Sequence, residues 1–195
     1  MKIIKYITSI SLTASILLAA PVNKQEEEMK SVIELGDKGS MMLASTLMKK
    51  MKKKIKGDKV MQAFEFCSNE AYTLTESVNK KLPNGVKVKR VSSKFRSPAN
   101  APLENEQKIL DAIENLKEAN LILPEYFIEK IDNHTYNYYK PLLINNKACL
   151  KCHGTLKDIE VKRAISQRYP IDNAVGYEMG DLRGAIIVTI DKSVK

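Results

Sequence analysis

The sequence predicts a single α+β domain, and three observations carry that prediction. Apolar residues recur at three- and four-residue steps over residues 24–56, a pattern typical of an amphipathic helix. Residues 86–91 alternate between apolar and basic side chains, which is the period of a half-buried strand. Residues 185–190 form a continuous apolar run, which favours a strand in the middle of a sheet. Long helices followed by interspersed strands and helices favour the α+β class.

Two long helices are expected in the N-terminal half, over residues 24–56 and residues 59–82. Gly36 and Gly39 indicate a break in the first of them, because glycine is a poor helix former. The second is expected to stop at the Pro-Asn-Gly turn of residues 83–85.

The C-terminal half is expected to mix short elements. After the strand at residues 86–91, two prolines between residues 98 and 102 exclude regular structure from the loop. The remaining elements are a helix at 104–118, one or two strands within 126–144, a short helix at 159–167 and the strand at 185–190.

The N-terminus predicts an exported protein. Lys2 and Lys5 precede an apolar run from Ile7 to Ala20 that is short for a transmembrane helix. Residues 1–20 are therefore interpreted as a signal peptide and residues 21–195 as the domain, in the periplasm or otherwise outside the cytoplasm. An uncleaved membrane anchor is the alternative, because the sequence around residue 20 is a poor cleavage site.

The positive charge of the chain could indicate an acidic partner or an anionic membrane surface, but its lysine run lacks the aromatic residues typical of nucleic-acid binding. The 195 residues include 32 Lys and Arg against 23 Asp and Glu, a formal net charge of +9. The lysine run at residues 49–54 contains no aromatic residue on which a base would stack. We interpret the positive charge as spread over solvated helix faces, and a membrane contact is expected only if the N-terminal segment is uncleaved.

The segment Cys149-Leu150-Lys151-Cys152-His153 matches the attachment signature of c-type haem. Each thiol of such a pair adds to one haem vinyl group, and the histidine supplies an axial imidazole to the iron. The sequence therefore predicts one covalently bound haem c, attached through Cys149 and Cys152 and ligated by His153.

The second axial ligand has three candidates in the sequence: Cys67, His134 and a methionine. Cys67 falls on the apolar stripe of its predicted helix, where a free cysteine is often only a small core residue. His134 lies in a polar turn, which favours a surface position. Six methionines occupy positions that helix-core packing explains: Met29, Met41, Met42, Met48, Met51 and Met61.

Four motifs in the same order resemble the single-haem c-type cytochromes and sensor modules with a PAS-like fold. The resemblance covers about residues 25–192, and its motifs are Ala63-Phe64-Glu65-Phe66-Cys67-Ser68, the Arg96 to Pro102 loop, Tyr139-Lys140-Pro141 leading into Cys149 to Gly154, and the Tyr169 to Ala185 segment.

This resemblance implies a PAS-like antiparallel sheet with long N-terminal helices, and an iron held by His153 and Cys67. One departure is that the family often has Ala-Pro after the cysteine, where this chain has Ala71-Tyr72. Arg96 or Arg183 is a candidate partner for a haem propionate, since guanidinium matches carboxylate geometry. A structural role in the surrounding turns is the alternative for both arginines.

These expectations favour a non-enzymatic function. An iron with two protein ligands offers no open coordination site, and the sequence contains no catalytic constellation. We expect a one-electron redox carrier with an unidentified redox partner protein. The alternative is a redox or gas sensor in which the cysteine ligand is displaced and a separate signalling partner responds, and a third hypothesis is a structural haem-binding subunit.

Overall fold

A four-stranded antiparallel sheet forms the centre of the computed structural model, which describes residues 23–57 and 59–194. The strand order is β1-β4-β3-β2, with β1 at Val86–Val91, β2 at Phe127–Lys130, β3 at Thr135–Leu143 and β4 at Leu182–Asp191. The apolar run of β4 lies between β1 and β3 and is buried from both faces, as expected. The α+β prediction is confirmed, while the predicted signal peptide of residues 1–20 lies outside the described residues.

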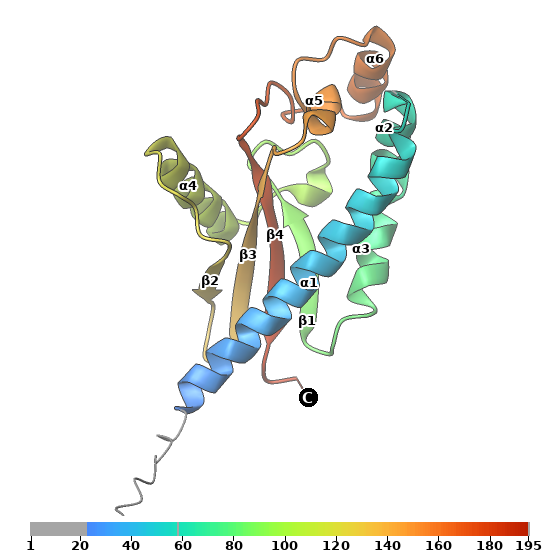
Figure 1. Cartoon of the computed structure of the whole chain (residues 1–195). Coiled ribbons are helices and arrows are strands. Elements are labelled where there is room, and N and C mark those ends of the chain that lie inside the picture. The colour runs from blue at the N-terminus through green and yellow to red at the C-terminus, as the bar shows by residue number, and fades with distance from the viewer. Residues whose placement is uncertain (1–22, 58, 195) are drawn as a thin grey trace, which may run out of the picture.

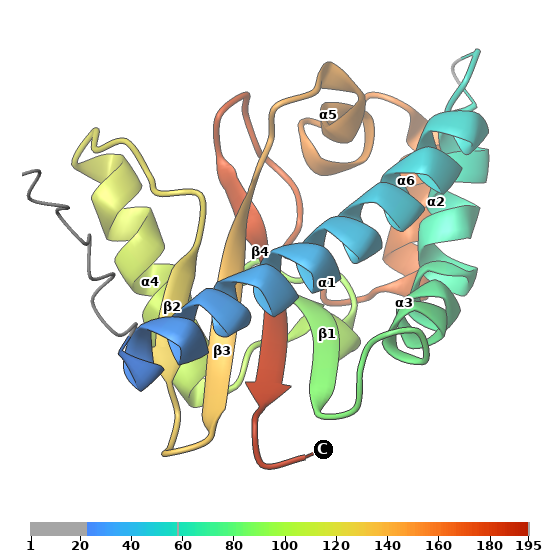
Figure 2. The ribbon, with the colours of Figure 1, turned by 60° about the horizontal axis from the view of Figure 1, so that its bottom comes forward.

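Helix α1 (Lys24–Lys54) lies across one face of the sheet (Figures 1 and 2). Its buried Val32 and Leu43 pack with Tyr138 of β3 and Val188 of β4. The expected break in this helix is wrong, because α1 is continuous through both glycines.

The two glycines of α1 allow the helix to approach the sheet closely. Both are buried, and a Cβ atom on Gly36 would overlap the ring of Tyr138. A Cβ on Gly39 would lie 3.1 Å from a methyl carbon of Val188. The glycines therefore weaken helix propensity in exchange for a close contact that a side chain would prevent.

The single helix expected over residues 59–82 is wrong, because two helices occupy this stretch. Helix α2 (Val60–Asn69) and helix α3 (Ala71–Asn79) meet at Glu70. Their partners differ: α2 contacts α5 and α6, whereas α3 contacts β1. The chain therefore changes direction where its two helices pack onto different neighbours.

Helix α4 (Glu104–Glu118) covers the other face of the sheet through a small apolar cluster. Leu110 of α4 packs there with Val91, Tyr139 and Ile187. The two sides of the sheet are thus covered by different helices, which explains why β4 shows no alternation of apolar and polar residues.

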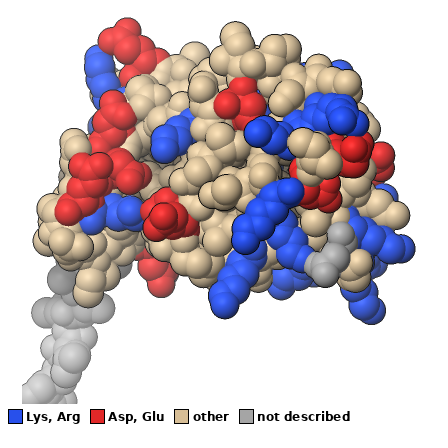
Figure 3. All heavy atoms as spheres, turned by 90° about the horizontal axis from the view of Figure 1, so that it is seen from above, with Lys and Arg blue, Asp and Glu red and all other residues tan. Residues whose placement is uncertain are grey.

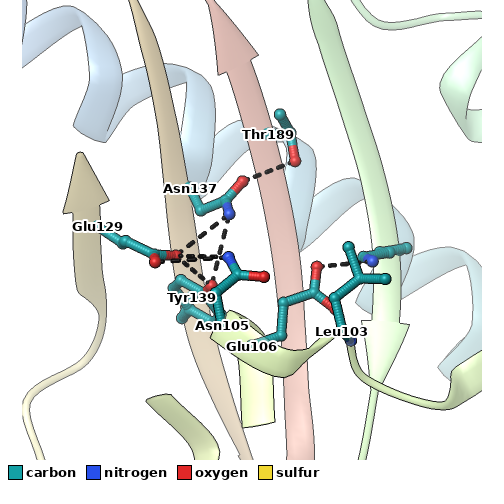
Figure 4. Close-up of polar contacts among 8 residues, drawn as sticks. Leu103, Asn105, Glu106, Glu129, Asn137, Tyr139 and Thr189 are labelled. Atoms are coloured by element: carbon teal, nitrogen blue, oxygen red, sulfur yellow. Dashed lines mark hydrogen bonds and ion pairs between the residues drawn. The ribbon is translucent and has the colours of Figure 1, made fainter. Parts of the chain in front are cut away.

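A polar network ties α4 and β2 to this face of the sheet (Figure 4). The buried Glu106 carboxylate pairs with Lys89 of β1 at 2.6 Å. The Tyr139 hydroxyl donates to Glu129 of β2 at 2.6 Å, and Asn137 bridges from Glu129 toward β4. Burial, together with the Glu129 hydrogen bond, raises the pKa of Tyr139 above its usual value. Tyr139 therefore stays protonated and donates its hydrogen bond to Glu129.

Two short helices lie at the end of the molecule reached by the C-terminal part of α1 (Figure 1). These are α5 (Lys147–His153) and α6 (Ile159–Arg168). The proline loop contains a short 3-10 helix, η1 (Pro98–Asn100), although no regular structure was expected there. Its proline stands at the first helical position, where no backbone donor is needed. None of the helices in residues 23–57 and 59–194 has the length and hydropathy to cross a bilayer.

We predict that Gly36→Ala destabilises the protein by about 1–3 kcal/mol, because the added methyl group overpacks against Tyr138. The loss should appear despite the roughly 1 kcal/mol that alanine gains over glycine in a helix. Urea unfolding followed by circular dichroism measures the effect. Gly39→Ala is the matched control and should lose less, since its nearest neighbours are methyl groups at 3.1 Å or more. A Gly36→Ala protein as stable as wild type would contradict this account.

Candidate haem site

Helix α5 carries the Cys-x-x-Cys-His segment and begins at a well-formed cap. The Asn146 side chain accepts a hydrogen bond from the backbone N–H of Ala148 at 2.9 Å. Cys149 and Cys152, three residues apart, lie close to one face of the helix, and both are half-buried, free thiols. Burial raises the pKa of both, to about 11 for Cys152, so the thiols are protonated at neutral pH.

The His153 ring is oriented by the backbone of the loop that follows α6. Its Nδ1 lies 2.9 Å from the carbonyl oxygen of Ala174. A carbonyl only accepts, so Nδ1 carries the proton and Nε2 keeps its lone pair. Burial, with the nearby charges of Arg183 and Arg96, lowers the pKa of His153 to about 3. The imidazole is therefore neutral and has the tautomer that a metal ligand requires.

Arg96 fastens this loop to α5. Its guanidinium meets the Asp172 carboxylate at 3.1 Å and 3.0 Å, and it also donates to the backbone oxygens of Cys152 at 2.7 Å and Ala174 at 3.2 Å. Ala174 is the residue whose carbonyl holds His153. Arg96 therefore positions the histidine through two backbone contacts, which favours the structural role.

Arg183 also has protein partners. It donates to the Ser92 hydroxyl at 2.7 Å and to the Lys94 carbonyl at 3.3 Å, and it lies 5.3 Å from the centre of the Tyr177 ring. That ring packs edge-on against His153, with ring centres 6.2 Å apart. Arg183 thus supports Tyr177, whose ring packs against His153.

Cys67 reaches the same region from α2. The prediction that it lies buried on the apolar stripe is wrong, because its side chain is exposed toward a cavity. Protein atoms nevertheless surround the sulfur, and burial raises the pKa of the thiol while the Arg90 charge opposes that rise. Packing of Phe64 against Val161 and Ile165 of α6 fixes α2 in this position.

One cavity of about 440 Å³ is lined by Cys67, Cys149, Cys152 and His153 together. The sequence separates Cys67 from the other three by more than eighty positions, and the fold brings α2 into contact with α5. Arg96 and Arg183 also line the cavity. The three cysteines, His153 and the two arginines therefore meet at one place.

Several lining residues were missed or misjudged in the sequence. Met48 and Met51 of α1 line the cavity, so the expectation that they fill the core is wrong. Arg90 lines it as well and was not singled out. The sequence feature that could have identified Arg90 is the alternation of β1, because this arginine occupies a position that the alternation assigns to an apolar residue. His134 is exposed, outside the cavity lining.

The charges of the cavity have a single sign. Among the described residues that line it, the charged side chains are Arg90, Arg96 and Arg183, with no Asp or Glu. Seen from the end that carries α5 and α6, the surface has a mostly uncharged centre with Lys and Arg gathered toward one side (Figure 3). This environment suits an anionic ligand.

We predict that Arg96→Ala destabilises the protein by roughly 3 kcal/mol, because it leaves the Asp172 carboxylate unpaired where each side chain is only 11 % exposed. Guanidinium chloride unfolding measures the loss. Arg163→Ala is the matched control, since its pair with Glu160 is 60 % and 63 % exposed and should be worth less than about 1 kcal/mol. Equal losses in the two variants would refute the role given to Arg96.

Comparison with known proteins places the chain in a family. The model of the Tll0287-like family matches residues 13–191. The crystal structure of the cyanobacterial heme-protein Tll0287 is similar, with a TM-score of 0.59 and 23 % identity over 91 % of this chain and 99 % of that chain. No curated protein matches this chain. The family match covers most of the sequence, including every residue of the cavity described above, and the chain therefore belongs to the Tll0287-like family.

Proposed function

We propose that this protein is an exported one-electron carrier with a single covalently bound haem. Cys149 and Cys152 would form the thioether bonds to the haem, and His153 and Cys67 would ligate its iron. The observation that supports this most strongly is that all four side chains line one cavity. The description of the similar solved protein as a heme-protein also supports it.

The cavity has the properties that a haem needs. Its volume of about 440 Å³ lies within the range of roughly 300–1,000 Å³ typical of cofactor sites. Apolar side chains of α1, among them Leu47, Met51 and Ile55, line part of the cavity and would suit the apolar macrocycle. The positive charge of the cavity lining suits a cofactor that carries two propionates.

The protein residues orient the metal ligands and tune the site. The Ala174 carbonyl fixes His153 in the tautomer that leaves Nε2 free, and Arg96 holds that carbonyl in place. When bound, the haem supplies an iron that exchanges one electron between the ferric and ferrous states. A cysteine ligand donates electron density and favours the ferric state, which lowers the potential.

Two protein ligands on the iron favour electron transfer over catalysis, because no coordination position is left for a substrate. The redox partner would be a protein outside the cytoplasm. The exposed lysines in the last turn of α1, Lys52 and Lys53, stand close to the cavity-lining residues of the same helix and suit an acidic partner surface.

A second candidate function, a redox or gas sensor, is favoured by one observation. A groove of about 460 Å³ lies beside the haem cavity, and Cys67 and Ser68 belong to the walls of both. A small molecule in the groove would lie beside Cys67, the residue that would ligate the iron in the proposed site. Such a molecule would compete with Cys67 for the iron in a sensor.

The attachment chemistry predicts that purified protein carries haem that survives denaturation. Wild type expressed with a c-type maturation system should show haem staining on a denaturing gel and a mass increased by one haem. The Cys149→Ser/Cys152→Ser protein should show neither, whereas Cys67→Ser should keep both. Loss of attachment in Cys67→Ser alone would contradict the assignment of the three thiols.

Ligation by Cys67 predicts a low-spin ferric EPR spectrum that changes when Cys67 is replaced by alanine. Met48→Leu and Met51→Leu are the controls, because these methionines share the cavity and should leave the spectrum unchanged. For a carrier, wild type should cycle reversibly under carbon monoxide without binding it, and Cys67→Ala should bind it when reduced. An unchanged spectrum in Cys67→Ala excludes the cysteine, and carbon monoxide binding by reduced wild type favours the sensor.

A further inference from the structure

Arg90 occupies a position in β1 that the strand period assigns to the interior. Val86 and Val88 precede it at two-residue steps and are buried at 6 % and 2 % exposure against α1 and α3. The side chain of Arg90 follows the same direction and reaches the haem cavity. A charged residue in this phase of a strand is unusual, because the position is otherwise filled by valine.

The Nε atom of Arg90 has no partner among the residues that the structure describes. It is buried and makes no hydrogen bond, whereas the neighbouring Arg96 is paired with Asp172. Arg96 and Arg183, the other two arginines of the cavity, have partners at 2.7 Å. Burial lowers the pKa of Arg90, although arginine remains protonated under all physiological conditions. An unpaired cation in this position is costly unless an anion joins it.

The surroundings of Arg90 indicate which anion completes the pair. No Asp or Glu is among the described residues lining the haem cavity. Glu76 lines the adjacent groove together with Lys87 and Lys89, and its carboxylate accepts a hydrogen bond from Asn79. The wall shared by the cavity and the adjacent groove consists of residues with hydrogen-bonding groups around Arg90: Cys67, Ser68, Ser97, Asn100 and Tyr169. This wall offers a carboxylate both a charge partner and additional donors.

We propose that Arg90 binds a haem propionate, at the polar wall between the cavity and the groove. The proposal rests on the haem function given above and assigns a role to a residue outside the attachment and ligand set. Pairing with Arg90 keeps the propionate ionised, and the positive charge offsets the negative charge near the iron. Arg90 is therefore a positioning residue that also raises the reduction potential.

The test is the reduction potential of the holoprotein between pH 5 and pH 9, measured by spectroelectrochemistry. Replacing Arg90 by glutamine removes a positive charge, so the ferric state should become more stable relative to the ferrous state at neutral pH. The ferric-to-ferrous ratio at a fixed potential should rise about threefold or more, equivalent to a reduction potential lower by about 30 mV for one electron. The propionate pKa should also rise into the measured range, so that the potential of the variant falls as pH rises, while wild type stays flat.

Two further variants make the result decisive. Arg168→Gln removes the same charge from the exposed end of α6 and should leave both the potential and its pH dependence as in wild type. Arg90→Lys keeps the charge without the fork geometry and should show a smaller change of the same kind as Arg90→Gln. If Arg90→Gln does not mature, Arg90→Lys decides, and a potential identical to wild type at every pH overturns the proposal.

The remaining outcomes separate this proposal from the one on which it rests. Wild type without covalent haem would refute the proposed function itself. Haem-loaded Arg90→Gln with an unchanged potential would refute only the propionate contact. A changed EPR spectrum of the Cys67-ligated iron, with no new pH dependence, would assign Arg90 to the cysteine sulfur and would also overturn the proposal.

Discussion

The geometry of the site depends on one buried ion pair, Arg96 with Asp172. Through the same guanidinium, the loop after α6 is joined to the backbone of α5, and the Ala174 carbonyl is held where it meets His153. The pair is only 11 % exposed on each side, so its charges act with little screening. Without this ion pair, the orientation of the His153 imidazole would not be fixed.

The second half of the site depends on apolar packing. Phe64 of α2 lies against α6, and the break at Glu70 lets α2 turn toward α5 while α3 follows β1. This arrangement presents Cys67 to the cavity. The site thus combines a helix placed by hydrophobic contacts with a loop placed by a charged clamp, and a haem joined to both would couple cofactor binding to folding.

The sequence was most informative where a local pattern is sufficient. Periodicity predicted helices at 24–56 and 104–118 and strands at 86–91 and 185–190, and fixed spacing identified the cysteine-histidine segment. The structure has these elements at Lys24–Lys54, Glu104–Glu118, Val86–Val91 and Leu182–Asp191. The sequence was misleading where a tertiary contact overrides helix propensity. Gly36 suggested a break, but it lies inside a continuous helix, where the absence of a side chain leaves room for the ring of Tyr138. Met48 and Met51 similarly have the pattern of core residues, but the surface they face is a cavity.

What the sequence by itself determined is the chemistry of the residues: two thiols and an imidazole at the spacing of haem attachment, and one further cysteine. Only the tertiary structure decided which distant residues share their cavity, because helix periodicity tells which face is apolar and not what that face meets. The tertiary structure also showed that the three arginines differ in their contacts. Arg96 and Arg183 have protein partners, whereas the buried Nε of Arg90 has none among the described residues. Burial makes a missing partner costly, because the group cannot bond to water instead.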